Sequence, residues 1–481
     1  MKKRTERRAL ADAGRSLRAK PIAAALATLL LAGCATFSAD GGMESVAANA
    51  RARIGETGEN LSRLQTKSDI AAAYAATKQL LAKPLTADAA MRIALLNNRG
   101  LQASLSDFGI AEADFVQAGH LRNPGLSFSR LRNGDELEID RSVMFDLAGL
   151  LTMPVRRGIE RRRFEQAKLQ AAAQAVRLAR ETRKAYFNAV AAQQSANYME
   201  QVAESAEASA ELARRMAKAG NWSKLEQARE EAFYAETMAQ RARARHNAVA
   251  AREQLTRLMG LDGKDAAFTL PDRLPDLPKV PNEQMNLEAT AMKQRLDIQT
   301  ARQDTEATAG ALGLRRATGF INVLDAGYIN KSQSGKPRAN GYEVSLELPI
   351  FDWGSARVTK AEALYMQSVH RTADTAVRAR SEVREAYSAY RTAWELATRY
   401  RDEIVPLRKK ISDEVLLRYN GMLASVFELL TDARGQVASV NAAIEAQRDF
   451  WLADTDLQAA VNGGGEPTTM RARSAGPALA D

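Results

Sequence analysis

The sequence predicts a mainly α-helical protein in which very long helices alternate with a few β-strands. Residues 159–219 contain neither glycine nor proline, and similar uninterrupted stretches cover 221–259 and 355–405. As one helix, the first stretch would be about 90 Å long, which is typical of coiled coils rather than of globular helices. The two halves of the chain also resemble each other, and between the helices each half has room for two strands.

The chain begins with a predicted targeting segment, residues 1–33. Eight of its side chains are basic and two are acidic, and a short apolar run, residues 21–33, follows them. This run is too short to cross about 30 Å of hydrocarbon as a helix, whereas the order of charge, apolar core and small residues is typical of a secretory signal peptide. Because the whole chain has a net charge of +10, only +4 remains beyond this segment, which argues against nucleic-acid binding.

Five further divisions of the chain are predicted. They are an N-terminal extension (34–84), a first repeat (85–262), a proline-rich linker (263–284), a second repeat (285–462) and a disordered tail (463–481).

The two repeats align at an offset of 201 residues. Arg183–Tyr186 (RKAY) matches residues 384–387 (REAY), and Gly220 matches Gly421. Each repeat is therefore predicted to contain a long helix, a tight turn at its glycine and a returning helix. Helix reversal by itself is a sufficient reason for a glycine at each turn.

The clearest predicted strand is residues 341–351. Tyr342, Val344 and every second residue to Ile350 face one side, and Glu343 and Glu347 face the other. This period suits a strand with lipid on one side and water on the other, and it equally suits an ordinary amphipathic sheet. Further strands are predicted at 126–131, 137–146 and 320–329, with a polar loop at 331–340. Four strands cannot close a membrane barrel, so strands in lipid would require oligomerisation.

Several sequence strings resemble the TolC-like outer-membrane efflux proteins, in their lipoprotein subgroup. The strings are residues 95–101 (LLNNRGL), 118–127 (AGHLRNPGLS), 347–354 (ELPIFDWG) and 418–421 (RYNG). The resemblance covers roughly residues 80–462. It implies a homotrimer with a 12-stranded β-barrel in the outer membrane over a long α-helical coiled-coil barrel. It further implies an exit duct that passively conducts substrates from an inner-membrane pump, reached through a periplasmic adaptor (a membrane fusion protein).

The segment Leu31-Ala32-Gly33-Cys34 resembles the lipobox of bacterial lipoproteins. The resemblance implies that Cys34 becomes the first residue of the mature chain and carries a covalent lipid such as palmitate. Ala35, in place of an aspartate, points to the outer membrane, so we expect a lipid-anchored protein that extends into the periplasm. A plain secretory peptide with an incidental cysteine is the alternative.

The resemblance also suggests a periplasmic gate after the second turn. In the family, a tyrosine and an arginine hold the gate shut, and two acidic residues ring the constriction. Tyr419 matches the tyrosine and Glu428 the first acid, but Thr431 and Ala424 replace the second acid and the arginine. Asp432, one helical turn after Glu428, is the candidate substitute. Solvated charges on a helix face are an equally good reading of Glu428 and Asp432.

The two turns themselves are the predicted tips of the molecule. There the resemblance implies contact with the adaptor, and the candidate residues are Gly220, Asn221, Gly421 and Met422.

Basic and aromatic residues also flank the predicted strands. Five arginines within residues 156–163 are predicted either to contact phosphates of the inner leaflet or to form a solvated helix face. Phe351 and Trp353 suit either an interfacial aromatic belt or packing where a strand meets a helix.

Other classes of protein fit less well. A single cysteine excludes a disulfide framework and a thiolate metal cluster, and three scattered histidines argue against a histidine-rich catalytic or zinc site. No catalytic triad or phosphate-binding loop is present, so we expect neither enzymatic activity nor a cofactor. The runner-up function is a lipid-anchored periplasmic coiled-coil adaptor or scaffold, which would have one helical hairpin and more β-structure.

Overall fold

The computed structural model describes residues 37–283, 286–319 and 323–463. Cys34, the predicted signal peptide and the predicted tail beyond Gly463 lie outside these residues. The chain divides into two compact units. The first comprises residues within 1–42, 108–167 and 301–371, and the second comprises residues within 43–107, 168–300 and 372–481.

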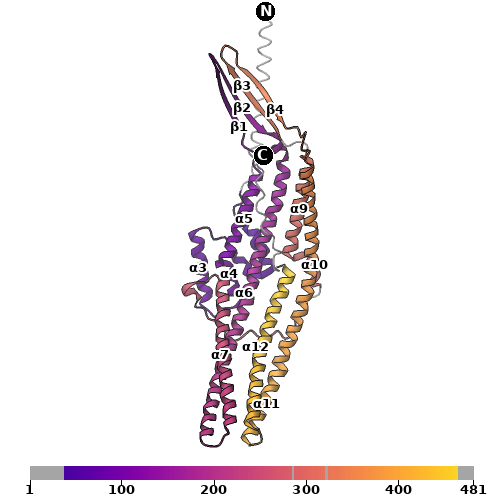
Figure 1. Cartoon of the computed structure of the whole chain (residues 1–481). Helices are drawn as coiled ribbons and strands as arrows, with labels where there is room; N and C mark the ends of the chain where they lie inside the picture. Colours follow the sequence, from indigo (N-terminus) through magenta and orange to yellow (C-terminus); the bar gives the residue numbers. More distant parts are fainter. Residues whose placement is uncertain (1–36, 284–285, 320–322, 464–481) are drawn as a thin grey trace, which may run out of the picture. The chain divides into compact units, whose positions relative to one another are not determined.

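The first unit contains a four-stranded antiparallel sheet whose strands follow the order of the chain (Figure 1). Its strands are β1 (Gly125–Asn133), β2 (Glu136–Asp146), β3 (Leu324–Gln333) and β4 (Ala339–Leu346). β1 and β2 form one hairpin, β3 and β4 form another, and β2 pairs with β3. The mainly α-helical fold class with four strands is thereby confirmed, and β1 and β4 are the edges of the sheet.

The predicted limits of two strands were wrong. The strand predicted to reach Phe351 ends at Leu346, because Pro349 has no N–H to donate to a ladder. The Ile350 N–H instead donates to the Leu348 carbonyl oxygen at 2.8 Å, in a tight turn. β3 begins at Leu324 and continues through residues 331–333, so the predicted loop at 331–340 shrinks to 334–338.

Four helices begin or end in the first unit and continue into the second. They are α5 (Arg99–Ala118), α6 (Leu147–Lys218), α9 (Leu296–Ala317) and α10 (Ser355–Arg399). Within the first unit, α6 packs on α5 through Phe164, which stacks on Phe108 and Phe115 with ring centroids 5.2 and 5.8 Å apart. The hydroxyls of Thr308 and Ser368, 2.8 Å apart, join α9 to α10.

The second unit holds the long helices that the sequence predicts. α6 and α7 (Lys224–Met259) form one helical hairpin, and α11 (Val405–Asn420) and α12 (Val426–Asn462) form another (Figure 1). A π-helical turn, η3 (Tyr400–Ile404), joins α10 to α11. The helix predicted over residues 355–405 thus continues beyond them through a widened turn, since Pro406 lies in the first turn of α11, where its missing N–H is not needed.

Shorter elements complete the second unit. They are α2 (Met43–Ile54), η1 (Gly55–Asn60), α3 (Lys67–Leu81), α4 (Ala87–Asn97), η2 (Gly263–Ala266) and α8 (Leu287–Gln294). Two apolar clusters hold α3, α4 and α8 to the long helices. One surrounds Tyr186, Phe187 and Met259, and the other surrounds Tyr390 and Phe450.

The segment predicted as a proline-rich linker is fixed to the long helices of the second unit. The indole N–H groups of Trp451 and Trp394 donate to the carbonyl oxygens of Pro275 and Pro278, each at 3.1 Å. The Asn282 N–H donates to the Tyr390 hydroxyl at 2.9 Å. The linker therefore lies along the helices instead of acting as a free tether.

Candidate functional site

The first tip, between α6 and α7, reverses the chain at a glycine. Gly220 has φ of +77°, which a residue without a Cβ adopts without strain. The Asn221 N–H donates to the Met216 carbonyl oxygen at 2.9 Å and so closes the end of α6. α7 then begins with a capping box, in which Ser223 and Glu226 satisfy each other's backbone N–H groups at 3.2 and 2.8 Å.

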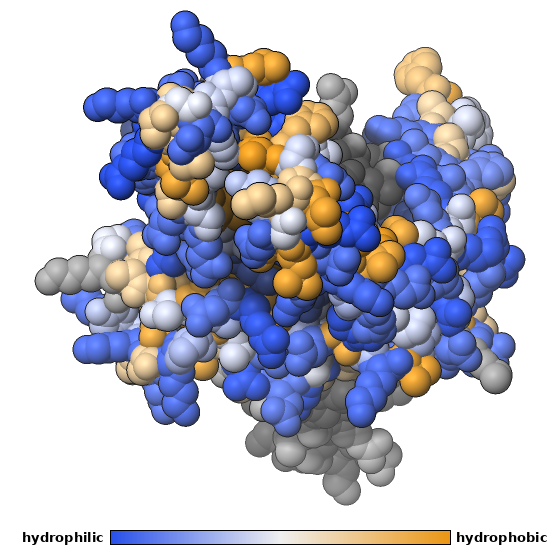
Figure 2. Space-filling view, turned by 90° about the horizontal axis from the view of Figure 1, so that it is seen from below, coloured by the Kyte–Doolittle hydropathy of each residue, from blue (hydrophilic) through white to orange (hydrophobic). Residues whose placement is uncertain are grey.

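The second tip, between α11 and α12, is built differently. Gly421 has φ of −81°, and the left-handed position is taken by Met422, with φ of 59°. A side chain in that region costs about 1–2 kcal/mol. Met422 is 94 % exposed, and the neighbouring Leu423 is exposed as well. Figure 2, which views the molecule from below Figure 1, shows hydrophobic side chains exposed among hydrophilic ones.

Glu428 and Asp432 differ in their surroundings. The Glu428 N–H donates to the Ser425 hydroxyl at 3.2 Å, and its side chain is exposed. In the described structure, α12 has only this serine half of a capping box, so the Glu428 carboxylate does not return to the backbone as Glu226 does. Asp432 is only 9 % exposed, and its Oδ2 is buried without a hydrogen-bond partner in the described chain.

The predicted gate residues therefore do not share one exposed face in this conformation. Tyr419, the third of them, is half-buried, and its carbonyl oxygen accepts the N–H of Met422 at 3.0 Å. The gating role of Tyr419, Glu428 and Asp432 stays a prediction.

A second buried acid occupies the matching position in the first hairpin. Beyond the turns the repeats align at an offset of 202, which pairs Glu226 with Glu428 and Glu230 with Asp432. Glu230 is 2 % exposed and accepts the Ser209 hydroxyl at 3.1 Å. Burial raises the pKa of Glu230, and the Ser209 hydrogen bond and the charge of Arg434 oppose the rise.

Close to the tips, two arginine–phenylalanine contacts join α7 to α12. Arg229 of α7 lies over the Phe427 ring, with Cζ 4.8 Å from the centroid. Arg434 of α12 lies over the Phe233 ring at 5.3 Å, and its Nη2 is 3.5 Å from Oε2 of Glu236. The resemblance did not predict these contacts, because it places the gate arginine at position 424, which is alanine here. The signal in the sequence was an arginine and a phenylalanine at helical spacing on each helix, Arg229 with Phe233 on α7 and Phe427 with Arg434 on α12.

The two faces of the sheet carry opposite charges. Successive side chains of a strand alternate between faces, and directly paired residues share a face, so the register assigns every strand residue. One face, called here the acidic face, carries Glu136, Glu138, Asp140, Asp146, Asp325 and Glu343. Its one cation is Lys331, whose Nζ is 3.2 Å from Oδ2 of Asp140.

The opposite face, called here the apolar–arginine face, has no carboxylate in its strands. Its charged residues are Arg130, Arg132 and Arg141, and its large apolar residues are Leu126, Phe128, Leu137, Ile139, Val143, Phe145, Leu324, Tyr328, Tyr342, Val344 and Leu346. Many of these apolar side chains are exposed in the single chain, as are Leu348, Ile350, Phe351 and Trp353 beyond β4.

Most of the arginine cluster at residues 156–163 contacts its own chain. Arg156 donates to the Gly149 carbonyl oxygen at 2.8 Å, and the Arg157 guanidinium lies 5.8 Å from the centroid of the Phe115 ring. Arg162 pairs with Glu306, and Arg163 pairs with Glu160 of its own helix. These contacts weaken the prediction that the cluster contacts lipid phosphates of the inner leaflet.

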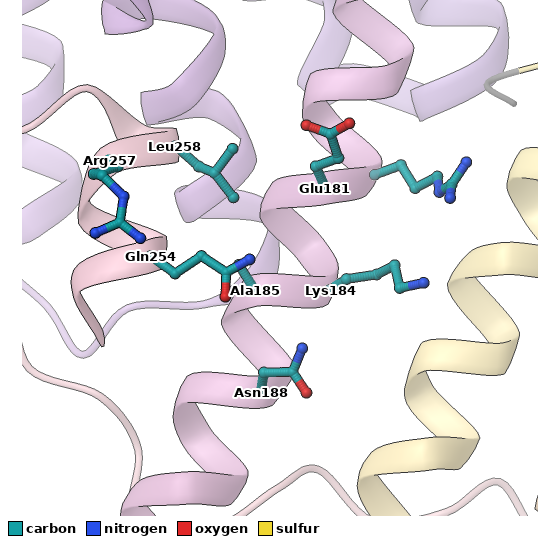
Figure 3. Close-up of a pocket in the computed structure, with 8 residues that line it drawn as sticks. Glu181, Lys184, Ala185, Asn188, Gln254, Arg257 and Leu258 are labelled. Carbon is teal, nitrogen blue, oxygen red and sulfur yellow. The ribbon is translucent and has the colours of Figure 1, made fainter. Parts of the chain in front are cut away.

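A cavity of about 500 Å³ lies between α6 and α7 in the second unit. Figure 3 shows Glu181, Lys184 and Asn188 on one wall, and Gln254 and Arg257 on the other. Lys184 Nζ is 2.7 Å from Asp456 of α12, and Arg180 Nε, also at the cavity, is 3.4 Å from the same carboxylate. Lys184 and Arg180 of this cavity therefore join α6 to α12.

Two further findings concern metals and membrane helices. Within the described residues, no three His, Cys, Asp or Glu side chains are grouped so that they could hold a metal ion. None of the helices in the described part of the chain is both long enough and apolar enough to cross a membrane.

No protein-family model and no curated protein sequence matches the chain. Solved structures do. CusC, whose crystal structures concern transmembrane channel formation, matches with a TM-score of 0.67 and 19 % identity over 78 % of this chain and 92 % of CusC. The outer membrane protein VceC of Vibrio cholerae matches with a TM-score of 0.66 and 16 % identity over 78 % of this chain and 96 % of VceC. The open MtrE outer membrane channel of Neisseria gonorrhoeae matches with a TM-score of 0.65 and 18 % identity over 78 % of this chain and 88 % of MtrE. At these identities the fold is what is shared, and this chain has the fold of the TolC-like outer-membrane efflux channels.

Proposed function

We propose that the protein is an outer-membrane channel, the exit duct of a tripartite efflux system, and that it conducts substrates passively. The observation that carries this proposal is the division of the sheet into an acidic face and an apolar–arginine face. A membrane strand needs lipid-compatible side chains on one face and polar ones on the other. In the proposed channel the acidic face lines the aqueous lumen.

The open edges of the sheet support a homotrimer. β1 and β4 are edge strands, and unpaired N–H and C=O groups in hydrocarbon each cost several kilocalories per mole. Pairing β4 of one copy with β1 of the next satisfies both edges. Three copies give a closed barrel of twelve strands, within the size range of membrane barrels.

The lipid anchor on Cys34 is part of the proposal. The Ser38 N–H and hydroxyl donate to Oε1 of Glu112 at 2.9 and 2.6 Å, which fixes the chain to α5 in the same unit as the sheet. Ser38 lies four positions after Cys34, a span of at most about 14 Å. A palmitate or other acyl chain on Cys34 can therefore enter the same membrane as the strands.

The tips supply the proposed contact with the periplasmic adaptor. Gly220, Asn221 and Gly421 are exposed there, and Met422 and Leu423 add exposed apolar surface. An adaptor links the channel to an inner-membrane pump, which supplies the energy of transport. We propose no catalytic or cofactor-dependent role for the chain.

Mass and conductance test the proposal together. The full chain, extracted in detergent, is weighed by light scattering corrected for detergent and then inserted into planar bilayers. We expect a particle of three chains that conducts ions in discrete steps. A monomer that does not conduct overturns the channel and leaves the lipid-anchored periplasmic adaptor or scaffold.

A further inference from the structure

Three arginines of the sheet lie together on one face and away from every strand carboxylate. Arg130, Arg132 and Arg141 are exposed and belong to the apolar–arginine face, while all six strand carboxylates belong to the acidic face. A random distribution of charges over strands would mix the signs. The segregation indicates that the three guanidinium groups meet an anionic partner outside the chain.

The arginines lie in the rows nearest the strand turns, among further apolar residues of the same face, and the exposed Phe128 shares the row of Arg141. Val143, Tyr328 and Tyr342 form one cross-strand row, and the next row toward the strand turns is Arg141, Asn330 and Asn340. Arg141 Nη1 donates to Asn330 Oδ1 at 3.1 Å, and Asn330 Nδ2 donates to Asn340 Oδ1 at 2.6 Å. Arg130 and Arg132 lie in the two rows beyond, paired with Ile139 and Leu137.

Aromatic side chains lie toward both ends of this face. Tyr328 and Tyr342 pack edge to face one row before Arg141, with ring centroids 6.1 Å apart. Phe351, 99 % exposed, and Trp353 follow the other end of β4. Phe351 lies nine positions after Tyr342, a span of at most about 30 Å. A membrane strand surface has an apolar band about 25 Å tall between two aromatic girdles.

We propose that Arg130, Arg132 and Arg141 bind the phosphate groups of lipids in the outer leaflet. The proposal rests on the outer-membrane position proposed above, in which the strand turns face outward. A guanidinium binds phosphate oxygens with two parallel N–H groups, and the aliphatic part of an arginine can lie along apolar surface beneath the headgroups. The arginines would thereby fix the depth of the sheet in the membrane.

Native mass spectrometry of the detergent-extracted full chain tests the proposal. The probes are lipid A with both of its phosphates and the same glycolipid with its phosphates removed. The test variant carries Arg130→Gln, Arg132→Gln and Arg141→Gln, and a second variant carries lysine at the three positions. Lys331→Gln is the matched control, because it removes a cation from the same sheet on its other face.

We expect the unaltered chain to retain phosphorylated lipid A far better than the dephosphorylated form. Each basic residue at an anionic surface contributes about a five-fold change in affinity, so the triple glutamine variant is expected to lose about 100-fold. The triple lysine variant, which preserves charge, is expected to retain most of the binding. Lys331→Gln is expected to bind as the unaltered chain does.

Two results would overturn the assignment. One is equal retention of the phosphorylated and dephosphorylated lipid by the unaltered chain, a comparison that needs no variant to fold. The other is unchanged binding by the triple glutamine variant. Conductance of the same samples separates this inference from the channel itself. A conducting chain without phosphate preference overturns only the lipid site, whereas a chain that neither conducts nor trimerises overturns the proposed function.

Discussion

The Arg434 guanidinium of α12 lies over the Phe233 ring of α7, with Cζ 5.3 Å from the ring centroid. The reciprocal pair, Arg229 of α7 over Phe427 of α12, lies nearer the tips at 4.8 Å. The two helical hairpins of one chain are thus joined by two cation–π contacts, each worth about 0.5–1 kcal/mol at exposed sites. Any motion that separates α12 from α7 must break both contacts.

Removing Arg434 should therefore favour an open tip. We expect Arg434→Ala to raise single-channel conductance several-fold in planar bilayers, because it removes both the Phe233 contact and the pairing with Glu236. Arg418→Ala is the control, since Arg418 pairs with Glu414 on its own helix. Unchanged conductance in Arg434→Ala would show that these contacts do not hold the tip closed.

Glu428 should influence ion selectivity. Its carboxylate is exposed and is not used in a capping box, so in the proposed trimer three copies can ring the pore entrance. We expect Glu428→Gln to lower the preference for cations, measured as the reversal potential under a salt gradient. Glu226→Gln, the matching change in the first hairpin, keeps its capping box because glutamine also accepts that bond. Equal shifts of the reversal potential in both variants would contradict a role of Glu428 in the gate.

Glu230 should make stability depend on pH. Burial raises the pKa of Glu230 above 4.5, so between 4.5 and its raised pKa the folded chain binds more protons than the unfolded chain. Stability therefore falls as pH rises through that window. Glu230→Gln should unfold at a higher temperature than the unaltered chain near neutral pH, and the difference should shrink below pH 4.5. A constant difference across the pH range would contradict this origin.

Arg295 should be among the least replaceable charges of the second unit. It is 2 % exposed and bonds Asp297 and Glu382 at 2.6 and 2.7 Å and the Ala460 carbonyl oxygen at 2.8 Å. Its partners Asp297 and Glu382 are 35 % and 45 % exposed, so water can solvate them once the guanidinium is removed. We expect Arg295→Ala to cost about 1.5–3 kcal/mol in denaturant unfolding, the usual worth of hydrogen bonds to charged groups. Arg384→Ala, which affects only an exposed pair with Glu288, should cost less than about 1 kcal/mol.

Cys34 can be tested by mass. We expect the mature chain to begin at Cys34 and to carry the added mass of acyl chains, and Cys34→Ser to lose both features and leave the membrane fraction more readily. Membrane strands alone would retain some of the variant. An unmodified Cys34 in the unaltered chain would contradict the lipid anchor and identify residues 1–33 as a plain secretory signal peptide.

Regular local patterns made the fold predictable from sequence, and long-range contacts limited what could be predicted about the tips. Uninterrupted helical composition and the alternation around Tyr342 and Val344 are local properties, and both appear in the structure. The burial of Asp432 depends on how α12 packs, which no spacing along α12 reveals. The offset alignment likewise predicted Gly421 at the second turn, but left-handed geometry there belongs to Met422. The repeat limits stay predictions.

The π-helical turn η3 gives the two hairpins unequal stiffness. α6 runs to its tip without a change of helical type, whereas α10 passes through η3 before α11 begins. A π turn already lacks the regular i→i−4 ladder, and Pro406 cannot donate to one, so bending there breaks few additional bonds. The second hairpin can consequently bend on one side only, at η3, because its other side, α12, is a single uninterrupted helix from Val426 to Asn462.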